Sequence, residues 1–265
     1  MKLSLGKWLL PSYVVLAFVF LLIPIAYTFV FSFNETEKSN IAWKRFTLEN
    51  WANVCNQQEV CQAFGNSIAI AVIATAVATV LGTAIAIALG RYKFKGRGAT
   101  NLLLFLPMAT PEVVMGAGLA AQFLNLGVGK GFWTIVIGHI MFTLSFVVVT
   151  VKARVATLDP RLEEAGRDLY AKPSSVFMRI TFPLLLPGIM AAAMLAFALS
   201  FDDFIITQFN AGAETTFPKF IYTAAARGIP PEANVLGSAV FIVLIAIVLV
   251  VQIRSSLKAK RLAKK

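Results

Sequence analysis

The sequence has few charged residues, few cysteines and a single histidine. Charged residues make up 14% of its 265 residues, whereas ordinary soluble domains carry roughly 25%. Because 58% of the residues are hydrophobic, this shortage argues against a soluble globule and against a disordered chain. Two Cys and 17 Gly are too few for a disulfide-rich secreted scaffold or a collagen-like chain. The composition therefore predicts an all-α, polytopic membrane protein.

The sequence also offers little for catalysis or cofactor binding. It contains no G-x-x-x-x-G-K-[ST] phosphate loop, so we expect no ATP site and no cofactor in this chain. His139 is the one histidine, which leaves no multi-histidine metal site and no Ser-His-Asp arrangement. We expect a buried neutral imidazole that bonds to a neighbouring helix, and the alternative is a proton relay. An intramembrane enzyme would need His139 to be essential.

Six stretches reach the ~20 apolar residues that a membrane helix needs. They lie near 8–33, 65–89, 101–126, 131–151, 183–207 and 234–253. The first is too long for a signal-peptide core, so we keep it as a membrane helix. The third contains Pro107, Pro111 and Glu112 and should be kinked or broken. We predict six transmembrane helices in a single domain over 1–265.

Basic residues gather in the segments that would share one side of the membrane. Residues 1–7, 90–100, 152–182 and 254–265 hold 18 of the 24 Lys and Arg. The positive-inside rule then places both termini in the cytoplasm. The net charge of +11 is explained by this topology and by contact with anionic lipid headgroups, so we expect no nucleic-acid partner.

The only two cysteines lie in one of the two longer segments that would face outward, 34–64 and 208–233. Cys55 and Cys61 would then be on the oxidising side, where a local disulfide and two free thiols both remain open. No His or further Cys lies near them, so we predict no metal site.

The 152–182 segment is longer than the other connections on its side and is patterned as two short helices. Asp159 can cap a first helix that runs to residue 171. Pro173 should end this helix, and a second short helix should cover 176–181. These residues alone leave open an amphipathic surface linker and a specific docking element.

This segment resembles the EAA loop of binding-protein-dependent ABC importer permeases. The family pattern reads E-A-A, three residues, Gly, nine residues, I, one residue and L-P. Four residues match it at the right spacing: Glu164, Ala165, Ile180 and Pro183. Three depart from it: Gly166, Tyr170 and Phe182. The family's Gly relieves a backbone turn, whereas a tyrosine is strained at positive φ. With Tyr170 at this position, either the turn needs no positive φ or it has shifted toward 172–173.

The resemblance implies that the loop is a cytoplasmic coupling helix that docks on a separate ATPase, which would bind ATP in place of this chain. The docking role would fall on Glu164, Ala165, Gly166, Arg167, Asp168, Ile180 and Pro183. The implied partners are a homologous permease subunit, two ATPase copies and an extracytoplasmic solute-binding protein. The implied location is a bacterial inner membrane.

Similarity to the polyamine (spermidine/putrescine) branch of this family extends over nearly the whole chain. It is carried by segments 91–96, 200–204, 217–222 and 231–234, and within this branch the chain resembles the second of two permease subunits. The branch implies a small cationic solute. The alternatives are another solute, such as an opine, a phosphonate or iron, and a membrane channel or scaffold that needs no ATPase.

Acidic residues within the predicted spans suggest where such a solute would pass. A charge at a helix centre costs about 2.5–3.5 kcal/mol on insertion, so acids there need a reason. Asp203 lies on a stripe of small and polar residues that should face the bundle interior: Ala196, Ser200, Asp203, Thr207 and Asn210. Asp202 lies about 100° around the helix and ranks below Asp203. Glu112 directly follows the expected break at Pro111.

We expect these three carboxylates to meet the ammonium groups of a polyamine. Phe201, Phe204 and Trp133 would add cation–π contacts. The alternatives are that the two aspartates cap the helix end or pair with Lys219 or Arg227, and that the aromatic rings only pack against lipid or protein.

Overall fold

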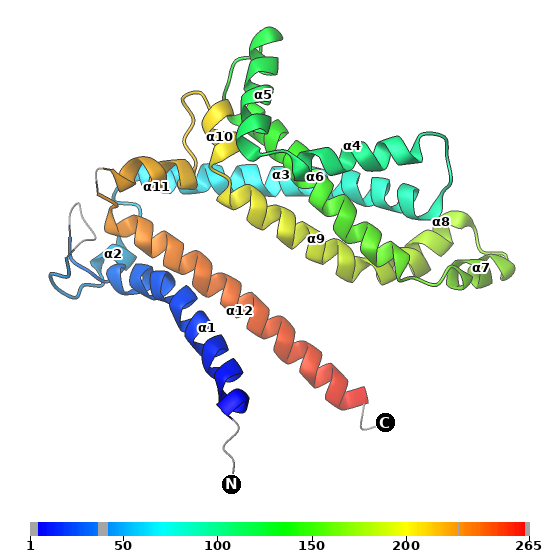
Figure 1. Ribbon diagram of the computed structural model, residues 1–265, viewed down its shortest axis with the longest axis horizontal. Helices are drawn as coiled ribbons and strands as arrows, with labels where there is room; N and C mark the ends of the chain where they lie inside the picture. The colour runs from blue at the N-terminus through cyan, green and yellow to red at the C-terminus, as the bar shows by residue number, and fades with distance from the viewer. Residues whose placement is uncertain (1–4, 37–41, 227, 263–265) are drawn as a thin grey trace. The chain divides into compact units, whose positions relative to one another are not determined.

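The computed structural model describes residues 5–36, 42–226 and 228–262 (Figure 1). These residues form helices and one isolated antiparallel bridge, between Asn34 and Phe46. They divide into two compact units. Unit 1 comprises Met1–Cys61 and Ile221–Lys265, and unit 2 comprises Gln62–Phe220. The grouping of 1–265 as a single domain stays a prediction.

Within the described ranges, five helices are long and apolar enough to cross a membrane. They lie in α1 (Leu5–Phe31), α3 (Gln58–Arg91), α6 (Phe132–Ala156), the continuous helix Pro173–Asp202 and α12 (Pro231–Leu262). The pair α4 (Arg97–Ala109) and α5 (Glu112–Asn125) is bent by 107° at its break (Figure 1). Such a pair is either a broken sixth span or a re-entrant loop, so the described residues hold five or six spans. The predicted all-helical, multi-pass fold is therefore confirmed.

The broken third span follows from its prolines. Pro107 lies in the last turn of α4, and Pro111 directly precedes α5. Thr110 between the helices is extended, with ψ of 131°, because a residue before proline is pushed out of the helical region. The chain therefore turns at the predicted position.

The fifth span differs from the prediction at both ends. It begins at Pro173, because α8 (Pro173–Val176) and a π-helical turn, η1 (Phe177–Thr181), run without a break into α9 (Phe182–Asp202). Pro173 was expected to end a helix but starts one, since its missing N–H is not needed at the first helical position. At the other end α9 stops at Asp202 rather than 207, and a short helix, α10 (Ile205–Asn210), follows.

Unit 2 is built around α3, α6 and α9. Their buried side chains form its main core: Ala78, Ala86 and Leu89 of α3, Val147, Val148, Val151 and Val155 of α6, and Leu185, Ile189, Ala192 and Ala196 of α9. Glycine in α3 permits the close approach of α6. A Cβ on Gly82 would lie 2.6 Å from Cγ1 of Val147, and a Cβ on Gly90 would lie 2.5 Å from Cγ1 of Val155. Small residues allow such packing where lipid supplies no hydrophobic force between helices.

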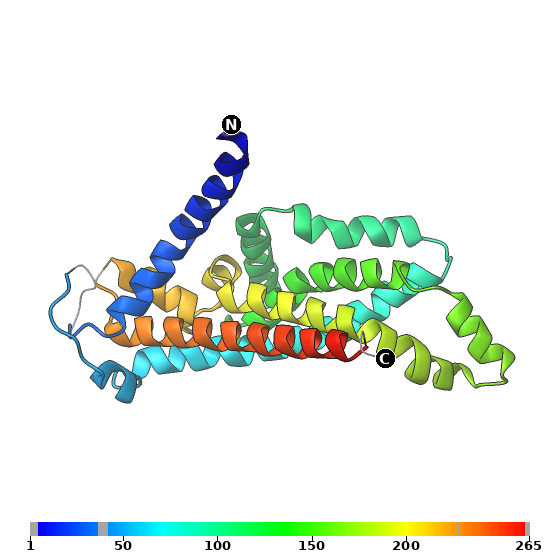
Figure 2. The same cartoon turned by 90° about the horizontal axis from the view of Figure 1, so that it is seen from below.

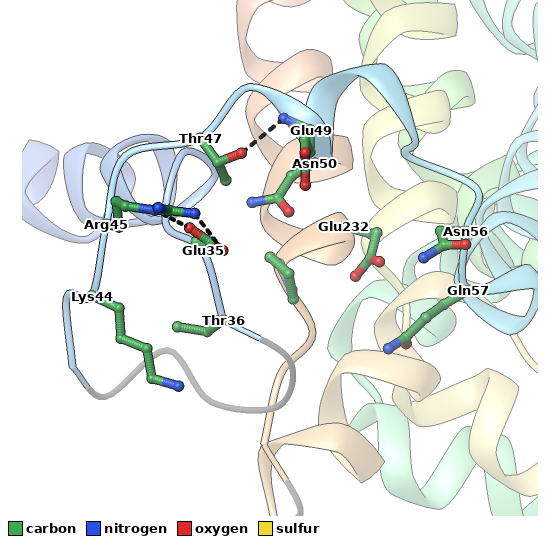
Figure 3. Close-up of a pocket in the computed structure, with 11 residues that line it drawn as sticks. Glu35, Thr36, Lys44, Arg45, Thr47, Glu49, Asn50, Asn56, Gln57 and Glu232 are labelled. Carbon is green, nitrogen blue, oxygen red and sulfur yellow. Dashed lines mark hydrogen bonds and ion pairs between the residues drawn. The ribbon is translucent and has the colours of Figure 1, made fainter.

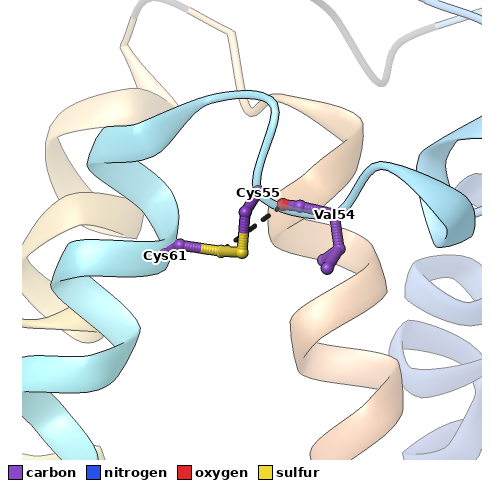
Figure 4. Close-up of a disulfide and its surroundings, with 3 residues drawn as sticks. All are labelled: Val54, Cys55 and Cys61. Carbon is purple, nitrogen blue, oxygen red and sulfur yellow. Dashed lines mark hydrogen bonds between the residues drawn. A yellow bond between two sulfur atoms is a disulfide. The ribbon is translucent and has the colours of Figure 1, made fainter.

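Unit 1 pairs α1 with α12 and places α2 (Glu49–Ala52) against the first part of α12. The segment after α1 is organised by Asn34, which is fully buried. Its Nδ2 donates to the carbonyl of Ala42 at 2.9 Å, and its Oδ1 accepts the backbone N–H of Lys44 at 2.8 Å. A disulfide between Cys55 and Cys61 closes the turn before α3 (Figure 4). Of the two states left open by the sequence, the structure has the bonded one.

Candidate functional site

The loop after α6 carries a short helix, α7 (Arg161–Asp168), which lies beside α8 in both views (Figures 1 and 2). The backbone N–H of Arg161 donates to Oδ1 of Asp159 at 3.0 Å, so the predicted cap is present. The helix ends at Asp168, three residues earlier than predicted, because the chain leaves the helical conformation at Tyr170.

Tyr170 takes the left-handed conformation itself, with φ of 57°. Among the described residues it is the one non-glycine residue with positive φ. Both sequence-based alternatives were therefore wrong: the turn needs a positive φ, and it has not shifted along the chain. The N–H of Tyr170 donates to the carbonyl of Arg167 at 2.9 Å, and the side chain is 98% exposed. No side-chain contact offsets the backbone strain that a non-glycine residue meets here.

Gly166 and Ile180, two of the predicted coupling residues, are packed together. Gly166 is the one buried residue of α7, and a Cβ on it would lie 2.8 Å from Cδ1 of Ile180 and 3.3 Å from Cγ2 of Val176. Glycine in place of the family's second alanine thus brings α7 close to the start of the fifth span. The other predicted coupling residues are exposed: Glu164, Ala165, Arg167, Asp168 and, at the start of α9, Pro183.

An ion pair that the sequence did not reveal ties α7 to α3. Nη2 of Arg91 lies 3.2 Å from Oε1 of Glu163, and both side chains are only about one fifth exposed. The hydroxyl of Thr181 also donates to Oε1 of Glu163 at 3.2 Å, and Arg91 reaches the carbonyl of Leu158 at 3.5 Å. Glu163 therefore anchors the loop to α3 and η1, while Glu164 faces outward beside a cavity of 440 Å³.

A buried polar cluster lies where α9 gives way to α10. Nδ1 of His139 is 2.8 Å from Oγ of Ser200, and its Nε2 is 3.1 Å from Oδ2 of Asp203 and 3.0 Å from Oγ1 of Thr207. His139 is therefore buried and bonded to a neighbouring helix, as predicted, although its pairing with Asp203 was not foreseen. The stripe from Ala196 to Asn210 is buried throughout, which confirms its expected orientation.

Asp203 also closes the break between the two helices. Its carboxylate accepts the backbone N–H groups of Ile206 at 3.3 Å and Thr207 at 2.9 Å. It thereby satisfies donors at the start of α10 that have no partner within the helix. Lys219, an alternative partner, donates to the carbonyls of Gly212 and Glu214. Arg227, the other alternative, lies outside the described residues.

The remaining predicted pathway residues do not join this cluster. Asp202 is exposed at the end of α9, Glu112 is exposed at the start of α5, and Trp133 is exposed at the start of α6. Phe201 is partly buried and packs against other rings, with a centroid distance of 5.8 Å to Phe64. Phe204 is partly buried between α9 and α10. The structure thus separates one fully bonded carboxylate, Asp203, from two exposed ones.

A metal centre has no candidate ligands in the described part of the chain, because no three His, Cys, Asp or Glu side chains there are grouped to hold an ion. Of the predicted site residues, the structure brings Gly166 and Ile180 together in the loop that carries α7, and it places Asp203 with His139 at the α9–α10 break.

The sequence relatives of this chain are membrane transport proteins. It is 34% identical over 257 residues to the spermidine/putrescine transport system permease protein PotC of Escherichia coli (strain K12), and the match covers 97% of each chain. It is 31% identical over 231 residues to the putrescine transport system permease protein PotI of the same strain, covering 84% of this chain and 82% of PotI.

Solved structures with the same fold also come from ABC transporters. A chain of a bacterial ABC transporter involved in import of the polysaccharide alginate superimposes with a TM-score of 0.66 at 16% identity, covering 97% of this chain and 98% of its own. A chain of the MetNI methionine ABC transporter gives 0.57 at 12% identity, covering 74% and 92%. Residues 78–263 match the family described as "Binding-protein-dependent transport system inner membrane component". The chain belongs to this family and is a multi-pass membrane protein.

Proposed function

We propose that this chain is a permease subunit of an ABC importer that carries polyamines, spermidine or putrescine, across a bacterial inner membrane. The observation that carries the proposal is the 34% identity to a spermidine/putrescine permease over 97% of the chain. The chain would supply half of the translocation pathway, and a homologous permease would supply the other half. A solute-binding protein would deliver the cargo.

Energy would come from two copies of a separate cytoplasmic ATPase, which bind ATP in place of this chain. This arrangement makes the chain a transport subunit and not an enzyme. The distribution of Lys and Arg supports an orientation with both termini and the α7 loop in the cytoplasm. The disulfide between Cys55 and Cys61 would then lie on the oxidising, outer side.

The α7 loop would transmit the ATPase movement to the membrane. Its exposed residues Glu164, Arg167 and Asp168 would dock on the ATPase, while the bond between Glu163 and Arg91 fixes α7 to α3. The contact of Gly166 with Ile180 places α7 on a helix that runs unbroken from Pro173 to Asp202. A displacement of the loop would therefore reach the α9–α10 break along one continuous helix.

The carboxylates would divide their roles according to their contacts. Asp202 and Glu112 are exposed and would meet the ammonium groups of the cargo, whose charge they match. Asp203 has protein partners for its carboxylate and would position the break together with His139. Its influence on cargo would pass through Asp202, the adjacent residue.

Uptake of radiolabelled spermidine and putrescine tests this function. Cells that lack their own polyamine import would carry the complete operon of this chain, and unlabelled opines, phosphonates and ferric iron would be added as competitors. The proposal is supported if labelled polyamine is imported and none of these competitors lowers its uptake. If another solute is imported and polyamines do not compete with it, the chain is still an ABC importer subunit but its cargo is not a polyamine. If uptake continues without the ATPase gene, the chain is a channel.

A further inference from the structure

Unit 1 contains a polar pocket that the proposed pathway does not use. It is lined by residues 35–36, by residues between Lys44 and Gln57, and by Pro231 and Glu232 in the first turn of α12 (Figure 3). Its volume of 820 Å³ falls within the roughly 300–1,000 Å³ of small-molecule sites. The pocket is therefore large enough for a small solute, and its chemistry decides which one.

Glu232 is the group in this pocket that most needs a partner. The residue is 7% exposed, and its Oε2 is buried without a hydrogen-bond partner among the described residues. Figure 3 shows its carboxylate projecting from α12 into the space between Thr36 and Gln57. The hydroxyl of Thr36, which lines the same pocket, is also buried and unbonded there. Burial of a carboxylate is unfavourable unless a donor or a cation meets it.

Of the two basic side chains that line the pocket, Arg45 is paired with a different carboxylate. Nη2 of Arg45 donates to Oε1 of Glu35 at 2.9 Å, and this pairing holds the pKa of Glu35 below its usual value. Lys44 is exposed and lines the same pocket. Among the described lining residues, the three carboxylates Glu35, Glu49 and Glu232 outnumber Lys44 and Arg45, so the net charge of the lining is negative.

We propose that this pocket binds a primary ammonium group of a small linear polyamine at the outer face of the membrane, with Glu232 as the anionic partner. An ammonium group has three N–H donors and no acceptor. Oε2 of Glu232 and Oγ1 of Thr36 supply acceptors in one cavity, which the side chains of Asn56 and Gln57 also line.

This inference rests on the proposed function, which supplies both the class of cargo and the outward orientation of the pocket. The site would retain cargo that has left the binding protein, before the pathway at Asp202 opens.

Equilibrium binding of radiolabelled spermidine to the complete transporter in nanodiscs, without the binding protein, tests the site. Glu232→Gln keeps the size of the side chain and removes its charge. We expect a loss of roughly 10- to 100-fold in affinity, the equivalent of one hydrogen bond to a charged group. Glu59→Gln is the matched control, because Glu59 is an exposed acid outside the pocket and should leave the affinity unchanged.

A second measurement uses the wild-type chain and does not depend on the folding of a variant. Spermidine should protect Glu232 from modification by a carbodiimide, with the labelled peptide read by mass spectrometry. Unchanged binding in Glu232→Gln or unprotected labelling of Glu232 would overturn the site. If Glu232→Gln instead weakens only the attachment of the binding protein, the occupant is a lysine of that protein and the polyamine proposal is wrong. Uptake of spermidine by intact cells separates these results from failure of the proposed function, which predicts import whatever the pocket binds.

Discussion

Replacement of Tyr170 by glycine should stabilise the α7 loop, contrary to the usual effect of glycine. The left-handed conformation costs a non-glycine residue about 1–2 kcal/mol. Glycine in turn adds conformational freedom to the unfolded loop, worth about 0.4–1 kcal/mol. Because the tyrosine side chain is 98% exposed, little packing is lost. The net gain should be about 0.5–1 kcal/mol, or a roughly two- to fivefold smaller fraction of open loop.

Amide hydrogen exchange of the purified transporter measures this fraction directly. The amides of α7 should exchange more slowly in Tyr170→Gly than in the wild type. Leu169→Gly is the matched control, because Leu169 is 82% exposed and has φ of −84°, so glycine relieves no strain there. It should speed exchange by a similar factor. Equal acceleration in both variants would refute the argument that Tyr170 is strained.

Three further changes test other parts of the structure. Asp202→Asn should reduce polyamine uptake without lowering the melting temperature. Asp203→Asn should lower both uptake and melting temperature, because it weakens bonds within the α9–α10 break. Equal melting temperatures of the two variants in detergent would contradict these separate roles. Cys55→Ser with Cys61→Ser should destabilise unit 1 by about 2 kcal/mol, since a short loop loses its closure, and an unchanged melting temperature would show that the disulfide contributes nothing. Gly82→Ala should cost about 1–3 kcal/mol by forcing α6 away from α3, as measured by the denaturation midpoint, and a neutral effect would argue against their close contact.

The sequence predicts the features that depend on local patterns. Long apolar runs predict the spans, paired prolines predict the break before Glu112, and Asp159 predicts the start of α7. The predicted ends of the fifth span were wrong because local sequence signals compete at both ends. Pro173 fits both the end of one helix and the start of the next, and the break after Asp202 depends on a carboxylate that bonds back to α10.

Features that depend on contacts between distant segments could not be predicted. The sequence has two adjacent acids in α7 and does not indicate that Glu163 faces Arg91 while Glu164 faces outward. The bond between His139 and Asp203 joins residues 64 positions apart on different helices. The alternation of small and polar residues predicts which face is buried but not its partner.

The measurement that tests the central claim most directly is ATP-driven spermidine uptake into proteoliposomes that contain the complete transporter and its binding protein, with ATP hydrolysis recorded in parallel. The wild type should import spermidine and hydrolyse ATP faster when the loaded binding protein is present. Glu164→Ala, which changes an exposed residue of α7, should lose uptake and this stimulation while the permease stays inserted and folded. Undiminished uptake by Glu164→Ala, or uptake by the wild type without ATP, would contradict the account.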